Sequence, residues 1–183
     1  METDAVILFL VMLTVAAHVS LAVGLALAVA GPWAPGLERS RDAVRQLLGA
    51  SALPLAWLVA SVGTAGSLFL SQVAHFTPCT LCWYQRIAMY PLVVVLGIAA
   101  WRRDLSVRPY VLALAAGGLL VSSYHYLIER FPSLDRGACD PAAPCTILWI
   151  WSLHYISIPL MAATAFVTIG VLILVAGVDH GGA

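Results

Sequence analysis

Lysine is absent from the 183-residue chain, and only 10% of its residues are charged, against roughly 25% in an ordinary soluble domain. The formal charges balance to zero and form no basic patch, which argues against nucleic acid as a partner. The chain is instead apolar, with 62% hydrophobic residues and a mean hydropathy of +0.95. A soluble protein of this size cannot bury that much apolar surface, so the composition predicts a membrane protein.

The few charges cluster and leave long apolar stretches between them. A stretch of about 20 apolar residues is enough for a helix to cross the hydrocarbon layer of a membrane. Trimming the stretches at turn residues predicts five membrane helices, at about Ala5–Ala30, Ala50–Leu70, Leu81–Trp101, Pro109–Tyr126 and Tyr155–Gly177. The predicted fold class is therefore an all-α, polytopic membrane protein.

Two segments of the N-terminal region, the first apolar stretch and residues 37–48, each allow two interpretations. Ala28-Val29-Ala30 resembles a signal-peptide cleavage site, but Glu2 and Asp4 stand where a signal peptide is positively charged. The apolar stretch also exceeds the roughly 7–15 residues of a signal peptide, so a retained membrane helix is favoured. Residues 37–48 place apolar residues at helical spacing among arginines, which fits a short amphipathic helix on the inner membrane surface or a solvated connector.

Arginine positions indicate how the chain crosses the membrane, because cytoplasmic loops carry an excess of positive charge. Six arginines lie in the loops after the first and third helices, and three lie on the other side: Arg39, Arg41, Arg45, Arg102, Arg103 and Arg108 against Arg86, Arg130 and Arg136. This asymmetry predicts an outer N-terminus and a cytoplasmic C-terminus. All four cysteines then lie on the outer side, where disulfides persist.

The first cysteine pair stands at the predicted start of the third helix. Thr77 is a candidate N-cap and Pro78 suits the first helical position, which places Cys79 in the first turn. Free N–H groups and the helix dipole favour a thiolate there. Arg86 follows Cys82 by one turn on the same face. An arginine near the membrane boundary needs a partner or a polar cavity, and here it can stabilise the Cys82 thiolate and the anion that develops on an acceptor.

The second cysteine pair, Cys139 and Cys145, lies in the loop before the fifth predicted helix. Gly137, Pro141 and Pro144 mark this stretch as a loop on the same outer side as the first pair. The five intervening residues allow a small disulfide ring. Because thiol–disulfide exchange needs access to a sulfur atom, an exposed loop suits exchange with another protein.

Three alternatives to redox-active cysteine pairs remain open from the residues alone. Four cysteines on an oxidising side can form two purely structural disulfides. They can also bind zinc, although the two pairs lie on different elements. A haem site would rest on His75, His125 and His154, but the chain has no Cys-x-x-Cys-His motif. We expect no resident metal, and we expect His18, alone in the first helix, to make a polar contact with another helix.

A family resemblance appears in the segment Cys79-Thr80-Leu81-Cys82-Trp83-Tyr84-Gln85-Arg86-Ile87-Ala88-Met89-Tyr90-Pro91. This segment is similar to the signature of the disulfide-bond-formation proteins of the DsbB/BdbC family. The resemblance covers about Ala50–Gly177, with four membrane helices, a Cys-x-x-Cys motif opening the second of them, and a further cysteine pair between the third and fourth.

The resemblance implies a four-helix transmembrane bundle, here with one extra N-terminal transmembrane helix, and thiol:quinone oxidoreductase activity in a bacterial cytoplasmic membrane. An exported thioredoxin-like (DsbA-like) protein would pass electrons to Cys139–Cys145, and this pair would pass them to Cys79–Cys82. A membrane quinone, ubiquinone or menaquinone, would accept them beside Cys82 and Arg86. Arg86 matches the family's quinone-site arginine by its distance from the second cysteine of the Cys-x-x-Cys motif. The implied outcome is disulfide bond formation in exported proteins.

The chain departs from the family pattern in its first 49 residues and at Gln85. Residues 1–49 are not part of the common core, which suggests a division into domains 1–49 and 50–183. Gln85 stands where well-studied members carry an acidic residue, and we count it among the candidate quinone-binding residues. His125, at the outer end of the fourth predicted helix, is expected to approach the quinone head group or to cap the helix.

A different class of function remains as the alternative, namely a membrane scaffold or transporter subunit with structural disulfides. The sequence argues against transport because no predicted membrane helix carries a buried carboxylate or a chain of ion pairs.

Overall fold

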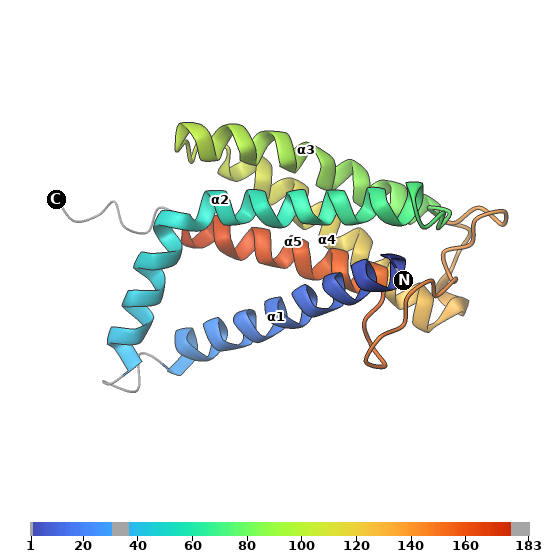
Figure 1. Ribbon diagram of the computed structural model, residues 1–183, viewed down its shortest axis with the longest axis horizontal. Helices are drawn as coiled ribbons and strands as arrows, with labels where there is room; N and C mark the ends of the chain where they lie inside the picture. Colours follow the sequence, from blue (N-terminus) through green and yellow to red (C-terminus); the bar gives the residue numbers. More distant parts are fainter. Residues whose placement is uncertain (1, 31–36, 177–183) are drawn as a thin grey trace.

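Within the part of the chain that the structure describes, five long helices account for most of the residues (Figure 1). The computed structural model describes residues 2–30 and 37–176. The helices are α1 (Glu2–Ala30), α2 (Leu37–Gln72), α3 (Thr80–Arg102), α4 (Arg108–Arg130) and α5 (Ile158–Val175), with a short 3₁₀ helix, η2, at Pro132–Leu134. Each long helix contains a segment long and apolar enough to cross a membrane. The predicted fold class is confirmed: four helices, α2–α5, pack together and α1 is the additional N-terminal helix.

The predicted bounds of α1 and α3 are within three residues of the observed ones, and α5 begins at Ile158 instead of Tyr155, but α2 and α4 are clearly longer than predicted. Helix α2 begins at Leu37, so residues 37–48 are part of one helix with the following membrane segment. The leucines and arginines of that stretch are strong helix formers. Pro54 removes the usual hydrogen-bond partner of the Ala50 carbonyl, and α2 bends without ending (Figure 1). Helix α4 continues to Arg130 instead of stopping at Tyr126. The predicted end of the last helix at Gly177, and residues 31–36, lie outside the described residues.

The core of the bundle lies between α2, α3, α4 and α5. Its largest fully buried side chains include Leu92, Leu96, Val111, Phe166, Ile169 and Ile173. Gly118 on α4 faces Phe166 on α5, and a Cβ atom at this glycine would collide with the Phe166 ring. Small residues allow membrane helices to approach closely, and this glycine is what permits the α4–α5 contact.

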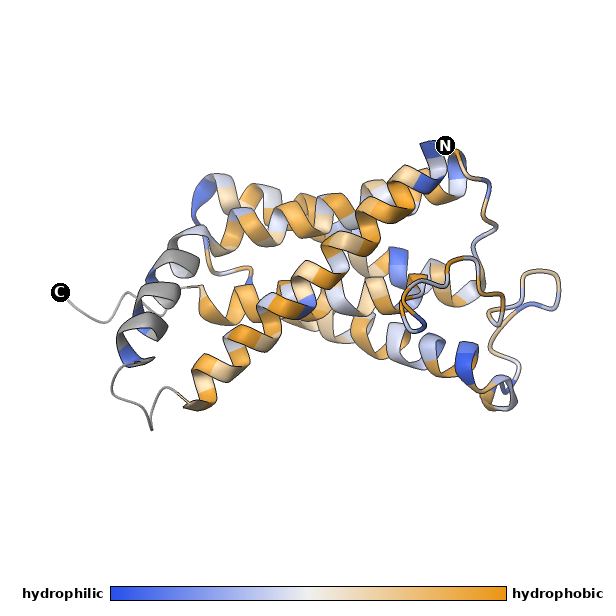
Figure 2. Cartoon of the chain, turned by 60° about the horizontal axis from the view of Figure 1, so that its bottom comes forward, coloured by the Kyte–Doolittle hydropathy of each residue, from blue (hydrophilic) through white to orange (hydrophobic). Residues whose placement is uncertain are grey.

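Helix α1 crosses the outside of the bundle against α2 and α5. Figure 2 shows that it is apolar along most of its length, and most of its side chains are exposed, as expected of a helix that faces lipid. The predicted polar contact of His18 is confirmed, because His18 Nε2 lies 2.8 Å from Thr164 Oγ1 on α5. The N-terminal end of α1 lies at the same end of the molecule as the 131–157 loop (Figure 1).

Candidate functional site

Cys79 is the N-cap of α3, not a residue of its first turn. The backbone of Cys79 is extended, with φ −77° and ψ 173°, and its Sγ accepts the N–H of Cys82 at 3.3 Å. The predicted N-cap Thr77 and first helical residue Pro78 are therefore wrong by two positions, because the thiol sulfur itself performs the capping that we assigned to the Thr77 hydroxyl. The consequence for chemistry is that the Cys79 sulfur sits directly at the positive end of the helix.

The two sulfur atoms of the first pair are poised to bond to each other. Cys79 Sγ and Cys82 Sγ are 2.8 Å apart, both as free cysteines, and Cys79 is buried while Cys82 is partly exposed. The hydrogen bond with Cys82 is the main influence that lowers the pKa of Cys79 to about 4; burial opposes this shift, and contact with His125 supports it. Cys79 is therefore a thiolate at neutral pH, which is the reactive form in disulfide exchange.

The second pair is a disulfide in the loop between α4 and α5. Cys139 and Cys145 are bonded, with Cα atoms 5.9 Å apart. The Asp135 carboxylate accepts the N–H groups of Gly137 and Ala138, at 3.1 and 3.0 Å, which shapes the turn that leads into Cys139. The two sulfurs differ in access, because Cys139 is half-buried whereas Cys145 is only 1% exposed. Only the Cys139 side of this disulfide faces outward.

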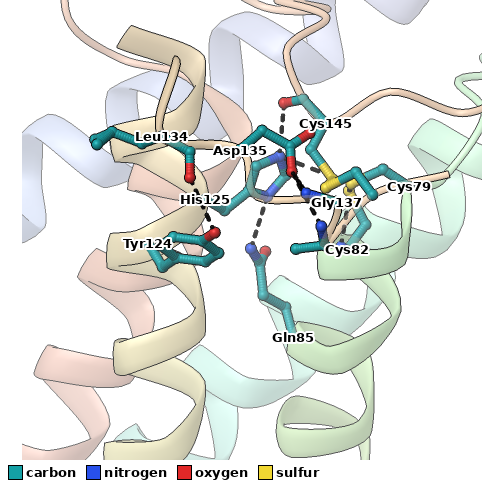
Figure 3. Close-up of a disulfide and its surroundings, with 11 residues drawn as sticks. Cys79, Cys82, Gln85, Tyr124, His125, Leu134, Asp135, Gly137 and Cys145 are labelled. Carbon is teal, nitrogen blue, oxygen red and sulfur yellow. Dashed lines mark hydrogen bonds between the residues drawn. A yellow bond between two sulfur atoms is a disulfide. The ribbon is translucent and has the colours of Figure 1, made fainter. Parts of the chain in front are cut away.

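His125 on α4 lies beside the two cysteine pairs and contacts a residue of each (Figure 3). Its Nε2 is 3.7 Å from Cys79 Sγ and 3.2 Å from the Cys145 carbonyl oxygen. Its Nδ1 is 3.0 Å from Nε2 of Gln85. Because an amide nitrogen can only donate, Nδ1 is the acceptor and Nε2 carries the proton, which points at Cys79 and at the Cys145 carbonyl. One imidazole thus contacts both pairs, and Cys79 and Cys145 pack in one buried cluster.

These side chains also have the composition of a metal site. The donor atoms of Cys79, Cys82 and His125 lie within 4.8 Å of one another, and thiolate and imidazole are ligands that zinc prefers. Among the described residues, neither His75 nor His154 belongs to this group of donor atoms. That the protein has no resident metal stays a prediction.

An apolar cavity of about 300 Å³ lies beside Cys82 of the first cysteine pair. Most of its lining is aliphatic or aromatic, and Cys82, Gln85 and Arg86 contribute polar atoms from α3. His125 is not among the lining residues, because its ring is turned toward the two cysteine pairs. The structure therefore brings Cys82, Gln85 and Arg86 together at one wall of the cavity. His125 does not line the cavity but contacts Gln85 of that wall.

Arg86 is buried, with 9% of its surface exposed. Its Nε donates to Ser67 Oγ and its Nη2 to the Ser67 carbonyl, each at 3.0 Å, and its guanidinium lies 5.0 Å from the centre of the Trp83 ring. Ser67 was missed by the sequence analysis, since a serine within an apolar stretch of α2 gives no signal of its own. These two bonds hold the guanidinium at the cavity wall.

Glu129 corrects the expectation that no membrane helix carries a buried carboxylate. It is 8% exposed, and Ser157 Oγ donates to its Oε2 at 2.6 Å. The sequence analysis ended the fourth helix at Tyr126 and so left Glu129 in a loop; in the structure it lies on α4, one turn beyond His125. Because Ser157 is the N-cap of α5, this bond ties the C-terminal end of α4 to the N-terminal end of α5.

The protein is thus a helical membrane protein with two adjacent cysteine pairs. Four of its membrane helices pack together, one pair stands at the start of α3, and the second pair packs against it from the loop before α5. The family model described as disulfide bond formation protein DsbB matches residues 49–176. The chain therefore belongs to the DsbB family, and it is a multi-pass membrane protein of disulfide bond formation. Whether residues 1–49 form a separate domain stays a prediction.

Several curated relatives share most of their length with this chain. A probable disulfide formation protein of Oceanobacillus iheyensis is 46% identical over 122 residues, which are 66% of this chain and 84% of that protein. Disulfide bond formation protein C of Bacillus subtilis is 43% identical over 114 residues, 62% of this chain and 83% of that protein. A probable disulfide formation protein of Chlamydia trachomatis is 39% identical over 124 residues, 68% and 90% respectively. No solved structure gives a significant match.

The low pKa of Cys79 leads to a prediction about its reactivity. In the reduced protein, the rate of alkylation of Cys79 by iodoacetamide should reach its maximum at about pH 5, one unit above the pKa of about 4. The rate should then stay constant to about pH 8. An ordinary thiol, with a pKa of about 8.5, becomes about tenfold faster with each pH unit over most of this range. Mass spectrometry of the Cys79 peptide after short exposures measures the rate.

His125→Ala should move this profile to higher pH, because it removes a group that stabilises the thiolate. Ser123→Ala, at an exposed position two residues earlier on α4, is the control and should leave the profile unchanged. A wild-type rate that still rises tenfold per unit between about pH 6 and 8 would contradict the assigned thiolate.

Proposed function

We propose that this protein is a thiol:quinone oxidoreductase that reoxidises an exported, thioredoxin-like (DsbA-like) dithiol protein and transfers the electrons to a membrane quinone. The observation that carries the proposal is the position of the Cys79–Cys82 pair. Cys79 touches His125, whose ring also contacts Cys145 of the loop disulfide, and Cys82 lines the apolar cavity. The pair thus lies between a site that another protein can reach and a site that suits an apolar oxidant.

The first step takes place at the loop disulfide. A thiolate of the partner attacks Cys139, the more accessible sulfur, which breaks the Cys139–Cys145 bond and leaves Cys145 as a thiolate. The second thiol of the partner then displaces Cys139, so the partner leaves with a disulfide and the loop pair holds two electrons and two protons.

The second step takes place inside the protein. Cys145, buried in one cluster with Cys79, attacks Cys79 when Cys79 and Cys82 are bonded, and Cys82 leaves as a thiolate. Cys139 then attacks Cys145 and releases Cys79, so the loop disulfide forms again and the first pair becomes a dithiol. The Nε2–H of His125 and the N-terminus of α3 stabilise the Cys79 thiolate that this releases.

The cavity residues fit a quinone. An apolar space of about 300 Å³ suits a ring with an isoprenoid tail, and Arg86 and Gln85 offer N–H donors for ring oxygens at the wall that contains Cys82. When bound, ubiquinone or menaquinone supplies an acceptor for two electrons and two protons, and Cys79 and Cys82 return to a disulfide. Arg86, held by Ser67, favours negative charge both on the Cys82 sulfur and on an acceptor oxygen.

The proposed orientation places both cysteine pairs on the outer face of the bacterial cytoplasmic membrane. The six-to-three division of the arginines supports it, and the N-terminal end of α1 lies at the cysteine-bearing end of the molecule (Figure 1). A reporter active only in the cytoplasm should be active when fused after Ala183 and inactive when inserted after Ala138. A reporter active only outside serves as the control and should give the opposite pattern; a reversed result for both reporters would contradict the orientation.

Substitutions in the two cysteine pairs should have different effects. Cys79→Ser and Cys82→Ser should each abolish quinone reduction, because each removes half of the pair next to the cavity. Cys139→Ser and Cys145→Ser should block oxidation of the protein partner yet leave Cys79 and Cys82 oxidisable by quinone when dithiothreitol is the reductant. Quinone absorbance and thiol trapping of the partner measure the two activities separately.

The same series distinguishes the alternative of a scaffold or transporter subunit with structural disulfides. In that case the redox state of all four cysteines stays unchanged when quinone is depleted from aerobic membranes. A loop variant that oxidised the partner at the wild-type rate would overturn the proposed order of transfer.

Arg86→Ala should reduce quinone turnover by about ten- to more than a hundredfold, because loss of a charge-assisted hydrogen bond in a low-dielectric site costs roughly 1.5–3 kcal/mol. Arg86→Lys should be less impaired, since it keeps the charge but loses the planar donor geometry. Ser67→Ala should have a smaller effect still, because the Ser67 carbonyl remains as a partner for Nη2. Steady-state quinone reduction by the purified variants, fed with dithiothreitol, tests this; wild-type turnover and affinity in Arg86→Ala would remove Arg86 from the acceptor site.

A further inference from the structure

Helix α1 lies outside the segment that matches the DsbB family, yet it is part of the cavity. Leu10, Leu13, Thr14 and Ala17 line the cavity from α1, opposite residues of α2, α3 and α5. We propose that α1 is a wall of the quinone site whose side chains determine which quinone ring the site admits. This inference rests on the proposed function and assigns a specificity-determining role to residues that the family match does not contain.

The contact between α1 and α2 is close on the cavity side. Leu10 is packed so tightly against Gly66 of α2 that a Cβ atom there would lie 3.1 Å from the Leu10 side chain. Thr14, one turn further along, is 7% exposed, and its hydroxyl donates to the Leu10 carbonyl at 2.9 Å. Thr14 therefore presents no unpaired polar group to the cavity, and α1 contributes an apolar surface.

The other edge of α1 is attached to α5 by the contact between His18 and Thr164. The Thr164 hydroxyl donates to the Leu160 carbonyl at 2.8 Å, so it accepts from His18 Nε2. The His18 ring also stacks on Tyr155, with ring centres 6.0 Å apart. In a membrane interior, polar side chains without a protein partner are costly, so this bond holds α1 at one position against α2 and α5.

The position of Ala17 gives the wall its effect on specificity. Ala17 carries the smallest of the four side chains that α1 contributes, and it precedes the anchored His18. Each carbon atom added on this wall removes space from a cavity of about 300 Å³ that would hold the quinone ring and part of its tail. Helix α1 cannot shift outward to compensate without breaking the bond between His18 and Thr164.

A matched pair of substitutions tests the wall. Ala17→Leu adds volume inside the cavity, whereas Ala16→Leu makes the same change at the neighbouring exposed position. Both are made in the full-length protein with all four cysteines oxidised, so binding is measured without turnover. Equilibrium dialysis in detergent gives the affinity for two probes with one isoprenoid unit each, a single-ring ubiquinone and a two-ring menaquinone.

We expect Ala17→Leu to weaken binding of the two-ring probe by about tenfold or more and of the single-ring probe by less, because overpacking a filled site is costly. Ala16→Leu should bind both probes as the wild type does. Leu10→Ala, which removes volume from the same wall, should change the ratio of the two affinities in favour of the two-ring probe.

A second measurement keeps the inference testable if Ala17→Leu does not fold. Ala17→Cys should be protected from methyl methanethiosulfonate by either probe that binds, whereas Ala16→Cys should react at the same rate with and without it. If the wild type binds neither probe, the proposed function fails. If the wild type binds quinone but the variants at positions 16 and 17 behave alike, the proposed function stands and the role of α1 is overturned.

Discussion

The structure depends on the absence of water from the membrane interior, which forces buried charged and imidazole side chains to find partners on other helices. Arg86 of α3 bonds to Ser67 of α2, and His18 of α1 bonds to Thr164 of α5. Two further hydrogen bonds join α4 to its neighbours for the same reason. His125 bonds to Gln85 of α3, and Glu129 bonds to Ser157 at the start of α5. The polar side chains of the bundle are thus also its cross-links.

These cross-links position the redox groups. Gln85 fixes the imidazole of His125 through Nδ1, and the proton on Nε2 is thereby aimed at Cys79 and the Cys145 carbonyl. Disulfide exchange between two pairs requires that they meet in a place that excludes competing thiols. Burial of Cys79 and Cys145 in one cluster provides that place, while the half-buried Cys139 remains within reach of another protein.

Polarity changes steadily along the proposed electron path. Cys139 lies in a loop shaped by Asp135, and Cys79 lies at a helix N-terminus beside an imidazole. Cys82 lies at the edge of an apolar cavity. A protein partner and a lipid-soluble oxidant can therefore act on the same chain without meeting. Helix α1 extends this separation, because it covers the cavity on the side where α2 and α5 would otherwise face lipid.

Much of this could be predicted from the sequence because the relevant signals are local. The length of each apolar stretch specifies a membrane helix, so the five candidate membrane helices of the described residues were predicted, and the spacing of Cys79, Cys82 and Arg86 identified the family. Helix ends were less accurate. Nothing in the letters distinguishes a capping thiol at Cys79 from a capping hydroxyl at Thr77, or shows that α4 continues through Glu129.

What the sequence by itself determined is therefore the number of helices, the elements that carry the cysteines and the family. The tertiary structure alone decided that His125 contacts both cysteine pairs, that Ser67 holds Arg86 and that α1 lines the cavity. The physical reason is that helix formation in a membrane depends on the composition of one segment. Contacts between helices depend on how each helix is rotated and how closely it approaches its neighbours, which is settled by the packing of all of them together.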